Sequence, residues 1–121
     1  MIAFAACVAD QQTFDRCARP GLSRCGEPDS QVAEIETESI FEGYNEALDE
    51  FTTRSDLEAL VLLHEDVELL DQELCAKLRR RLQDPSIAVI GAIGARAVRS
   101  LCWWEGEMRG RVSETRGLID A

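Results

Sequence analysis

The stretch that decides the fold is Leu60-Val61-Leu62-Leu63-His64-Glu65-Asp66-Val67-Glu68-Leu69-Leu70, in which an apolar run ends abruptly in polar residues. The run shows no alternation of polar and apolar side chains, which predicts a strand buried on both faces in a parallel sheet covered by helices. In open α/β sheets, ligands bind beyond the carboxyl ends of the strands. His64, Glu65 and Asp66 lie at that end of the strand and are therefore the first candidates for functional residues.

The segments on either side of this strand predict further strands and helices. Further strands are predicted over residues 2–8, 31–37 and 87–93. Helices are predicted over residues 14–18, ended by Pro20-Gly21, then from Ser39 to about residue 51, and from Asp71 to a stop before Pro85. Ser39 and Glu42 have the spacing of a capping box, in which each side chain satisfies a free backbone N–H of the first turn.

Two of these helices carry apolar residues at helical spacing, which predicts their buried faces. The first face consists of Phe41, Tyr44, Leu48 and Phe51, and the second of Leu70, Leu74, Leu78 and Leu82. Strands that alternate with helices indicate a parallel sheet with right-handed crossovers. The sequence thus predicts one α/β domain over residues 1–121, a Rossmann-like half-sheet, with its core in residues 1–95 and an irregular tail in residues 96–121.

Composition limits the classes of partner. The chain has 121 residues, 45% of them hydrophobic, which is enough for one globular core. Its formal net charge of -10 argues against nucleic acid and anionic membranes as partners. No segment approaches the length of a membrane span, and the apolar start lacks the basic residues of a signal peptide.

The cysteines argue for free thiols. The chain has five, with no Cys-x-x-Cys pair, which argues against a disulfide framework and a zinc ribbon. Free thiols in a reducing compartment predict a cytoplasmic protein.

An ordered series of motifs then resembles a known family. The series consists of residues 39–48 (SIFEGYNEAL), 62–67 (LLHEDV), Asp84-Pro85 with Val89-Ile90-Gly91, and Trp103-Trp104-Glu105-Gly106 with Gly110. It resembles the amino-terminal, nucleotide-sugar-binding half of inverting family 2 glycosyltransferases of the GT-A fold, in the branch with a histidine at the start of the DxD motif. The resemblance implies an incomplete, mostly parallel GT-A sheet flanked by helices.

The resemblance also implies roles for individual residues. Asp66 would bind a divalent cation, Mn²⁺ or Mg²⁺, on the diphosphate of the nucleotide-sugar, and a carboxylate suits such a hard cation. His64 takes the place of the first Asp of the motif, either as a second metal ligand or on the nucleotide. Glu65, the middle residue of the motif, and Asn45 and Glu36 would lie at the nucleotide.

The chain is about half the length of a complete catalytic domain of that family. An inverting displacement needs a base opposite the leaving diphosphate. The catalytic residue is unknown from the sequence, and Glu105 and Glu107 are candidates only by default. The whole function implied is transfer of a glycosyl group to an acceptor hydroxyl.

Two other functions compete with this one. A truncated sheet would leave apolar surface uncovered, which favours a non-catalytic module that self-associates. A receiver-like or hydrolase domain could use Glu65 and Asp66 for metal, but the paired acids that a receiver needs after the first strand are absent from the sequence.

Overall fold

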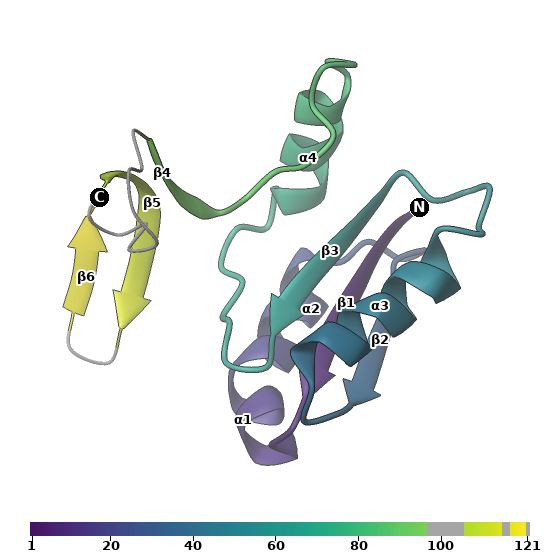
Figure 1. Ribbon diagram of the computed structural model, residues 1–121, viewed down its shortest axis with the longest axis horizontal. Helices are drawn as coiled ribbons and strands as arrows, with labels where there is room; N and C mark the ends of the chain where they lie inside the picture. The colour runs from purple at the N-terminus through teal and green to yellow at the C-terminus, as the bar shows by residue number, and fades with distance from the viewer. Residues whose placement is uncertain (97–105, 115–116, 121) are drawn as a thin grey trace. The chain divides into compact units, whose positions relative to one another are not determined.

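The structure of the chain, a computed structural model, describes residues 1–96, 106–114 and 117–120. It divides into two compact units, Met1–Asp84 and Pro85–Ala121, which are described separately here (Figure 1).

The first unit is built on a parallel sheet of three strands. The strands are β1 (Ile2–Val8), β2 (Gln31–Glu36) and β3 (Ala59–His64), in the order β2-β1-β3. All three were expected from the sequence, and the predicted α/β class with a parallel sheet flanked by helices is confirmed. β1 and β2 are each followed by a helical segment that returns the chain to the start of the next strand, as a parallel sheet requires.

The position of β3 corrects one prediction. The strand expected to be buried on both faces lies at an edge of this sheet, and Leu63 is its only fully buried residue. Every residue of β1 is buried, so β1 is the central strand. The apolar run of β3 is compatible with either position, because periodicity alone does not report how many neighbours a strand has.

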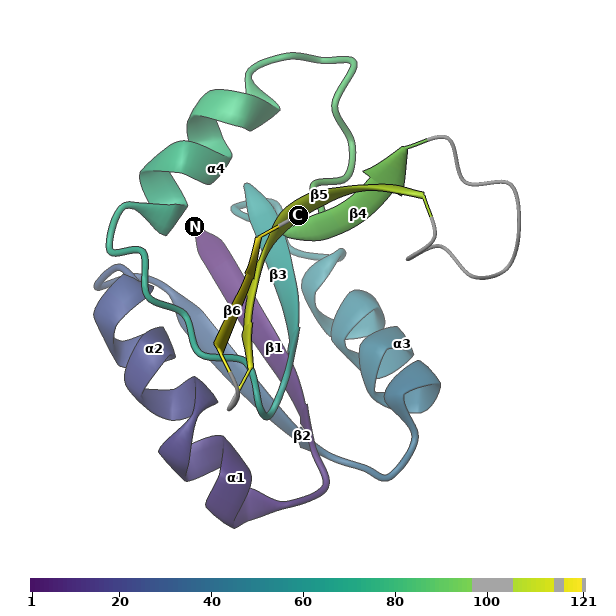
Figure 2. The ribbon, with the colours of Figure 1, turned by 90° about the vertical axis from the view of Figure 1, so that its left-hand side faces the viewer.

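Helices cover both faces of the sheet (Figure 2). One face is covered by α1 (Gln11–Arg16), α2 (Ala18–Cys25) and α4 (Leu74–Leu82), whose apolar side chains join Ile2, Phe4, Ala6 and Val8 in one cluster. The opposite face is covered by α3 (Ile40–Phe51), where Ala5, Ile35 and Ala47 form a smaller cluster. Successive residues of β1 therefore supply opposite cores, as the pleat of a strand dictates.

The start of α3 is as predicted, with one change. The Ser39 hydroxyl accepts a hydrogen bond from the Glu42 backbone N–H at 3.4 Å, as in a capping box. The backbone N–H of Ser39 does not bond to Glu42. It donates to the Thr37 hydroxyl at 3.0 Å, so Thr37 satisfies the second free donor.

The buried face of α3 differs from the predicted one. Phe41 is 80% exposed and Leu48 is 41% exposed, whereas Gly43, Ala47 and Phe51 are buried. The residues of β1 that face α3 are small, namely Ala3, Ala5 and Cys7. The helix lies close to the sheet with Gly43 and Ala47 inward. Phe51 is buried at the end of the helix, whereas Phe41 and Leu48 are left at the margin.

Two other helix boundaries also needed correction. Pro20-Gly21 does not break a helix; Pro20 lies in the first turn of α2, where a backbone N–H has no intrahelical partner in any case. The helix expected from Asp71 begins at Leu74, and the Asp71 carboxylate accepts a hydrogen bond from the Glu73 N–H just before it. Leu70 therefore lies outside α4 and is 64% exposed, while Leu74 and Leu78 pack on the core as predicted.

The second unit is an antiparallel sheet of β4 (Ile93–Arg96), β5 (Glu107–Glu114) and β6 (Gly117–Asp120) in that order. The predicted parallel strand over residues 87–93 is wrong: residues 87–92 form no strand, and Val89 is 86% exposed. The predicted irregular tail is likewise wrong for residues 107–114 and 117–120. Trp103, Trp104, Glu105 and Cys102 lie outside the described residues.

No helix in the part of the chain that the structure describes is both long enough and apolar enough to cross a membrane.

Candidate functional site

The candidate site lies at the carboxyl edge of the parallel sheet. In the strand register Val8 pairs with Glu36, and Cys7 pairs with His64, so the three strands end at nearly the same level. The segments that leave the sheet there are the turn from β1 into α1, the connection from β2 to α3, and the turn at His64-Glu65-Asp66. Of the predicted site residues, Glu36, His64, Glu65 and Asp66 belong to this edge, and Asn45 lies one turn into α3.

His64 is the last residue of β3, and its side chain is exposed. The Tyr44 ring lies edge-on to the imidazole, with ring centroids 6.2 Å apart and an angle of 74° between the planes. Tyr44 is half-buried, and burial raises the pKa of its hydroxyl above the usual value. Tyr44 thus joins α3 to the end of β3. The sequence alone predicts only that Tyr44 packs on the apolar face of its helix.

Asp66 follows in a tight turn closed by the Val67 N–H, which donates to the His64 carbonyl at 3.2 Å. Its carboxylate is exposed and makes no hydrogen bond or ion pair with any residue that the structure describes. Glu36 is exposed at the end of β2 in the same way. These two acids are therefore available to a ligand or an ion.

Glu65, in contrast, is bonded to the turn that follows β1. Its Oε2 accepts hydrogen bonds from the backbone N–H groups of Ala9 at 2.6 Å and Asp10 at 2.8 Å. No sequence signal could have found this contact, because both donors are backbone groups more than 50 residues away along the chain.

Asp10 is a further acid at this edge, but its carboxylate is already engaged. It caps α1 by accepting from the Gln12 N–H at 3.0 Å and from the Thr13 hydroxyl at 2.5 Å. The hydrogen bond from Thr13 is the main cause that holds the pKa of Asp10 below its ordinary value. Asp10 thus adds negative charge to the site while both of its carboxylate oxygens cap α1.

Glycine brings α3 close to this edge. A methyl group added at Gly43 would lie 2.5 Å from the Cys7 sulfur and 2.8 Å from the Thr37 methyl, so the helix could not carry a larger residue there without moving. The next two residues are Tyr44 and Asn45. Asn45 is exposed on α3, beside the residue that contacts His64.

The protein alone offers few metal ligands. Among the residues that the structure describes, no group of three or more His, Cys, Asp or Glu side chains is arranged to hold a metal ion. Any cation at Asp66 and His64 would have to complete its shell with water or ligand oxygens. Glu107, one of the default candidates for a base, is exposed at the start of β5 in the second unit.

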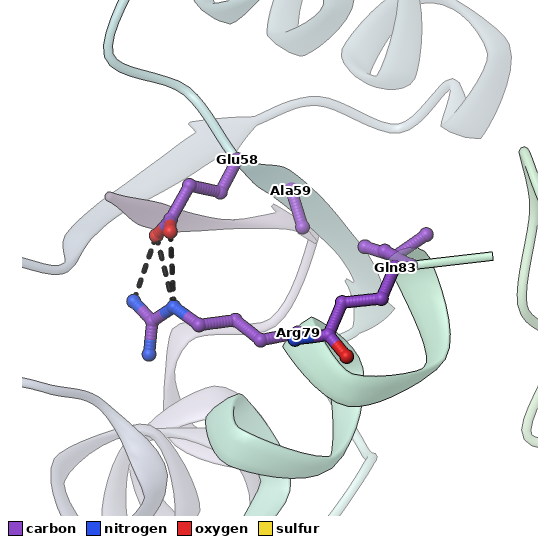
Figure 3. A pocket seen from close by; sticks show the side chains of 5 residues that line it. Glu58, Ala59, Arg79 and Gln83 are labelled. Atoms are coloured by element: carbon purple, nitrogen blue, oxygen red, sulfur yellow. Dashed lines mark hydrogen bonds and ion pairs between the residues drawn. The ribbon is translucent and has the colours of Figure 1, made fainter. Parts of the chain in front are cut away.

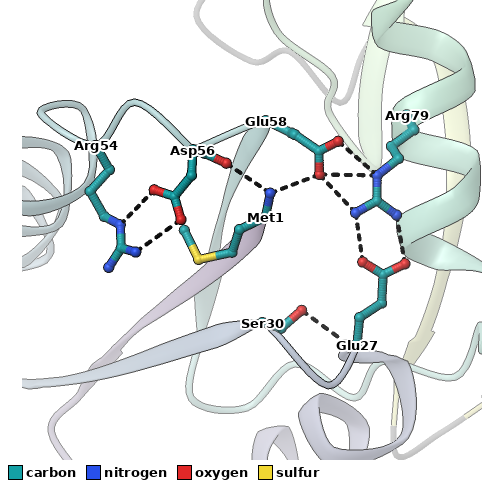
Figure 4. Close-up of polar contacts among 7 residues, drawn as sticks. All are labelled: Met1, Glu27, Ser30, Arg54, Asp56, Glu58 and Arg79. Atoms are coloured by element: carbon teal, nitrogen blue, oxygen red, sulfur yellow. Dashed lines mark hydrogen bonds and ion pairs between the residues drawn. The ribbon is translucent and has the colours of Figure 1, made fainter.

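A cavity of about 290 Å³ lies at the other end of β3, lined by Glu58, Ala59, Arg79, Leu82 and Gln83 (Figure 3). Its position at the amino end of a parallel strand is not where α/β sheets bind ligands. Its charges are also already paired. Figure 4 shows the Arg79 guanidinium between Glu27, at 2.6 and 2.7 Å, and Glu58, at 2.7 Å.

This ion-pair cluster is a structural feature. Glu58 also accepts from the Met1 nitrogen at 2.9 Å, and hydrogen bonds from Arg79 and from that nitrogen lower the pKa of Glu58 to about 2. The cluster joins α4 to the start of β3 and to the loop after α2. It leaves no unpaired charge for a ligand, so the cavity is not the candidate site.

Comparison with known proteins decides the family. A model of a glycosyltransferase-like family matches residues 3–119, nearly the whole chain. The chain belongs to this family. It is also 34% identical over 118 residues to the streptomycin biosynthesis protein StrF of Streptomyces griseus, an alignment that covers 94% of the chain.

The chain spans about two fifths of the length of StrF, since the alignment covers 41% of that protein. No solved structure matches the chain. Family membership agrees with the observed architecture, a parallel α/β sheet flanked by helices, as expected for part of a GT-A or Rossmann-like fold.

Proposed function

We propose that the carboxyl edge of the sheet binds the diphosphate of a nucleotide-sugar through a divalent cation, for transfer of a glycosyl group to an acceptor hydroxyl. Within this proposal the chain corresponds to the donor-binding half of an inverting family 2 glycosyltransferase, with His64-Glu65-Asp66 in place of the DxD motif. The observation that carries it is the Asp66 carboxylate after β3, beside the end of β1, in a member of a glycosyltransferase-like family. This carboxylate is exposed and has no partner among the described residues.

The charge of this edge supports a cation. Asp10, Glu36 and Asp66 gather negative charge where the strands end, and a diphosphate would be repelled unless a cation lay between. Magnesium and manganese are held in many phosphate sites by one or two carboxylates, with the remaining ligands from phosphate oxygens and water. Asp66, with His64 as a second donor, fits that pattern. When bound, the ion would neutralise the charge of the leaving diphosphate.

The nucleotide would lie against the ends of β1 and β2, where Glu36 and Asn45 are exposed. The catalytic base has no assigned residue in this proposal. The alignment covers 41% of the relative StrF. In this proposal, the acceptor site and the base lie in a segment that corresponds to the rest of StrF.

Calorimetric titration with UDP and GDP, each with and without Mn²⁺, tests the proposal. We expect saturable binding of one nucleotide that requires the metal and is lost in Asp66→Ala. Asp49→Ala is the matched control, because Asp49 is exposed on the last turn of α3 and its replacement changes the net charge equally. Equal, metal-independent binding by wild type and Asp66→Ala, or no binding at all, would refute the proposal.

One observation favours a second function, a non-catalytic assembly module. In the described part of the first unit, β3 pairs only with β1, and Phe41, Leu48 and Leu62 are exposed apolar residues on the side of the sheet that α3 covers. Unpaired strand edges beside apolar surface promote association. Light scattering over a range of concentrations would detect a dimer, and Leu62→Lys should abolish it; a concentration-independent monomer would exclude this function.

A further inference from the structure

The Glu65 carboxylate joins parts of the site that are distant in sequence. It extends from the turn after β3 to two successive backbone N–H groups in the turn from β1 into α1. Hydrogen bonds from N–H groups to a carboxylate are shorter and stronger than those between neutral groups, and both distances here are short. The contact links the end of β3, the end of β1 and the start of α1.

The two neighbours of Glu65 are more exposed than Glu65 itself. His64 and Asp66 are exposed, whereas Glu65 is half-buried. In a tight turn the direction of one side chain constrains the directions of the residues on either side, since they share the backbone. Holding Glu65 against β1 therefore fixes where His64 and Asp66 point.

We infer that Glu65 is a positioning residue of the donor site, which acts by anchoring the turn that presents His64 and Asp66 and by ordering the Ala9-Asp10 turn beside it. The inference rests on the proposed function, and it assigns Glu65 a role through the backbone of Ala9 and Asp10 instead of contact with the nucleotide-sugar. Replacing a residue that orients the direct ligands of a metal typically lowers the affinity for that metal by about 10–100-fold.

Two substitutions separate positioning from direct contact. Glu65→Ala removes the acceptor, and we expect Mn²⁺-dependent binding of UDP or GDP to weaken by about 10–100-fold. Glu65→Gln keeps an oxygen that can accept both N–H groups but removes the charge, and we expect binding within about threefold of wild type, since hydrogen bonds to a neutral acceptor are weaker but still formed. Glu68→Ala, an exposed acid in the following segment, is the matched control and should bind as wild type does.

Hydrogen exchange of the Ala9 and Asp10 amides, measured by NMR without ligand, reports the contact itself. These two amides should exchange slowly in wild type and Glu65→Gln, and faster in Glu65→Ala. The urea midpoint of each variant shows whether the fold as a whole is retained. Loss of binding in Glu65→Ala, rescue in Glu65→Gln and matching exchange rates would together support the inference.

The other outcomes are distinguishable from one another. If wild type binds and Glu65→Ala binds equally well, the inference is overturned while the proposed function stands. If Glu65→Gln loses binding as fully as Glu65→Ala although its amides stay protected, Glu65 contacts the ligand through its charge, and positioning is refuted. If wild type binds no nucleotide, the proposed function fails, and slow amide exchange would then identify the contact as part of the fold only.

Discussion

Substitution of Gly43 by alanine tests how α3 is held against the sheet. In most helix interiors this change stabilises a protein, because alanine has the higher helix propensity by about 1 kcal/mol. At Gly43 the added methyl would meet the Cys7 sulfur at 2.5 Å and the Thr37 methyl at 2.8 Å, both closer than unbonded atoms approach. The two effects oppose each other, so their magnitudes decide the sign.

The contact with β1 should prevail. Overpacking a closely packed core costs about 1–3 kcal/mol, and two atoms must move here, one of them on the fully buried central strand. Because two atoms must move, the cost belongs to the upper part of this range, about 2–3 kcal/mol. Subtracting the gain of about 1 kcal/mol in helix propensity leaves a net loss of about 1–2 kcal/mol. For a unit of this size that corresponds to a fall in Tm of roughly 5–15 °C.

Circular dichroism at 222 nm during urea and thermal unfolding measures this loss, since all helices of the described chain lie in the first unit. The double variant Cys7→Ala/Gly43→Ala removes the sulfur and should recover about 1 kcal/mol relative to the sum of the single changes. Gly43→Ala with stability equal to or above wild type would refute the close approach. Because Tyr44 follows Gly43, a shifted helix should also weaken the nucleotide binding proposed above.

Three further predictions concern the core, the ion pairs and the thiols. Phe4→Ala on β1 should cost about 3–5 kcal/mol by urea unfolding, because the ring is fully buried; a cost below 1 kcal/mol would contradict that packing. Glu58 has its folded pKa lowered to about 2 by Arg79, so the stability it adds is present above about pH 5 and is lost as the pH falls toward 2. The urea midpoint should fall over this range, and should fall less in Glu58→Gln; equal slopes would contradict the ion pair. Iodoacetamide should label half-buried Cys17 before the buried thiols of Cys7, Cys25 and Cys75, because burial raises the pKa values of these three. Peptide mapping by mass spectrometry measures the order of labelling, and faster labelling of the three buried thiols would contradict their burial.

Features set by local sequence were predictable. The strands at 2–8, 31–36 and 59–64 follow from short apolar or alternating runs, and the start of α3 follows from Ser39 and its spacing to Glu42. Each of these signals depends on residues a few positions apart. The α/β class follows in turn from the order in which these elements alternate.

Features set by distant partners were not predictable. The inward face of α3 depends on the small residues of β1, so Phe41 and Leu48, which look like core residues on a helix taken alone, are exposed. The apolar run before Ile93 was read as a parallel strand, yet Ile93 begins an antiparallel one. Short apolar runs do not reveal which partner strand they will find.

The same distinction holds within the candidate site. The polar residues after β3 could be located from the sequence because they end an apolar strand, and the carboxyl end of a parallel strand is a predictable place for ligands. Their individual orientations could not. Glu65 is distinguished from Asp66 by its contact with the backbone of Ala9 and Asp10, which the linear sequence does not contain.

The two ends of β3 show how the chain uses its excess of acidic residues. At the amino end, Glu58 is paired with Arg79, which also holds Glu27, so the charges there stabilise the fold. At the carboxyl end, Glu36 and Asp66 have no cationic partner among the residues that the structure describes, although the chain carries 13 lysine and arginine residues. Unpaired carboxylates that gather at one edge repel one another, and that repulsion is relieved when a cation binds between them and an anionic ligand. The unequal pairing of charge, and not the position of the cavity, is thus the strongest physical argument for the proposed donor site at the carboxyl edge.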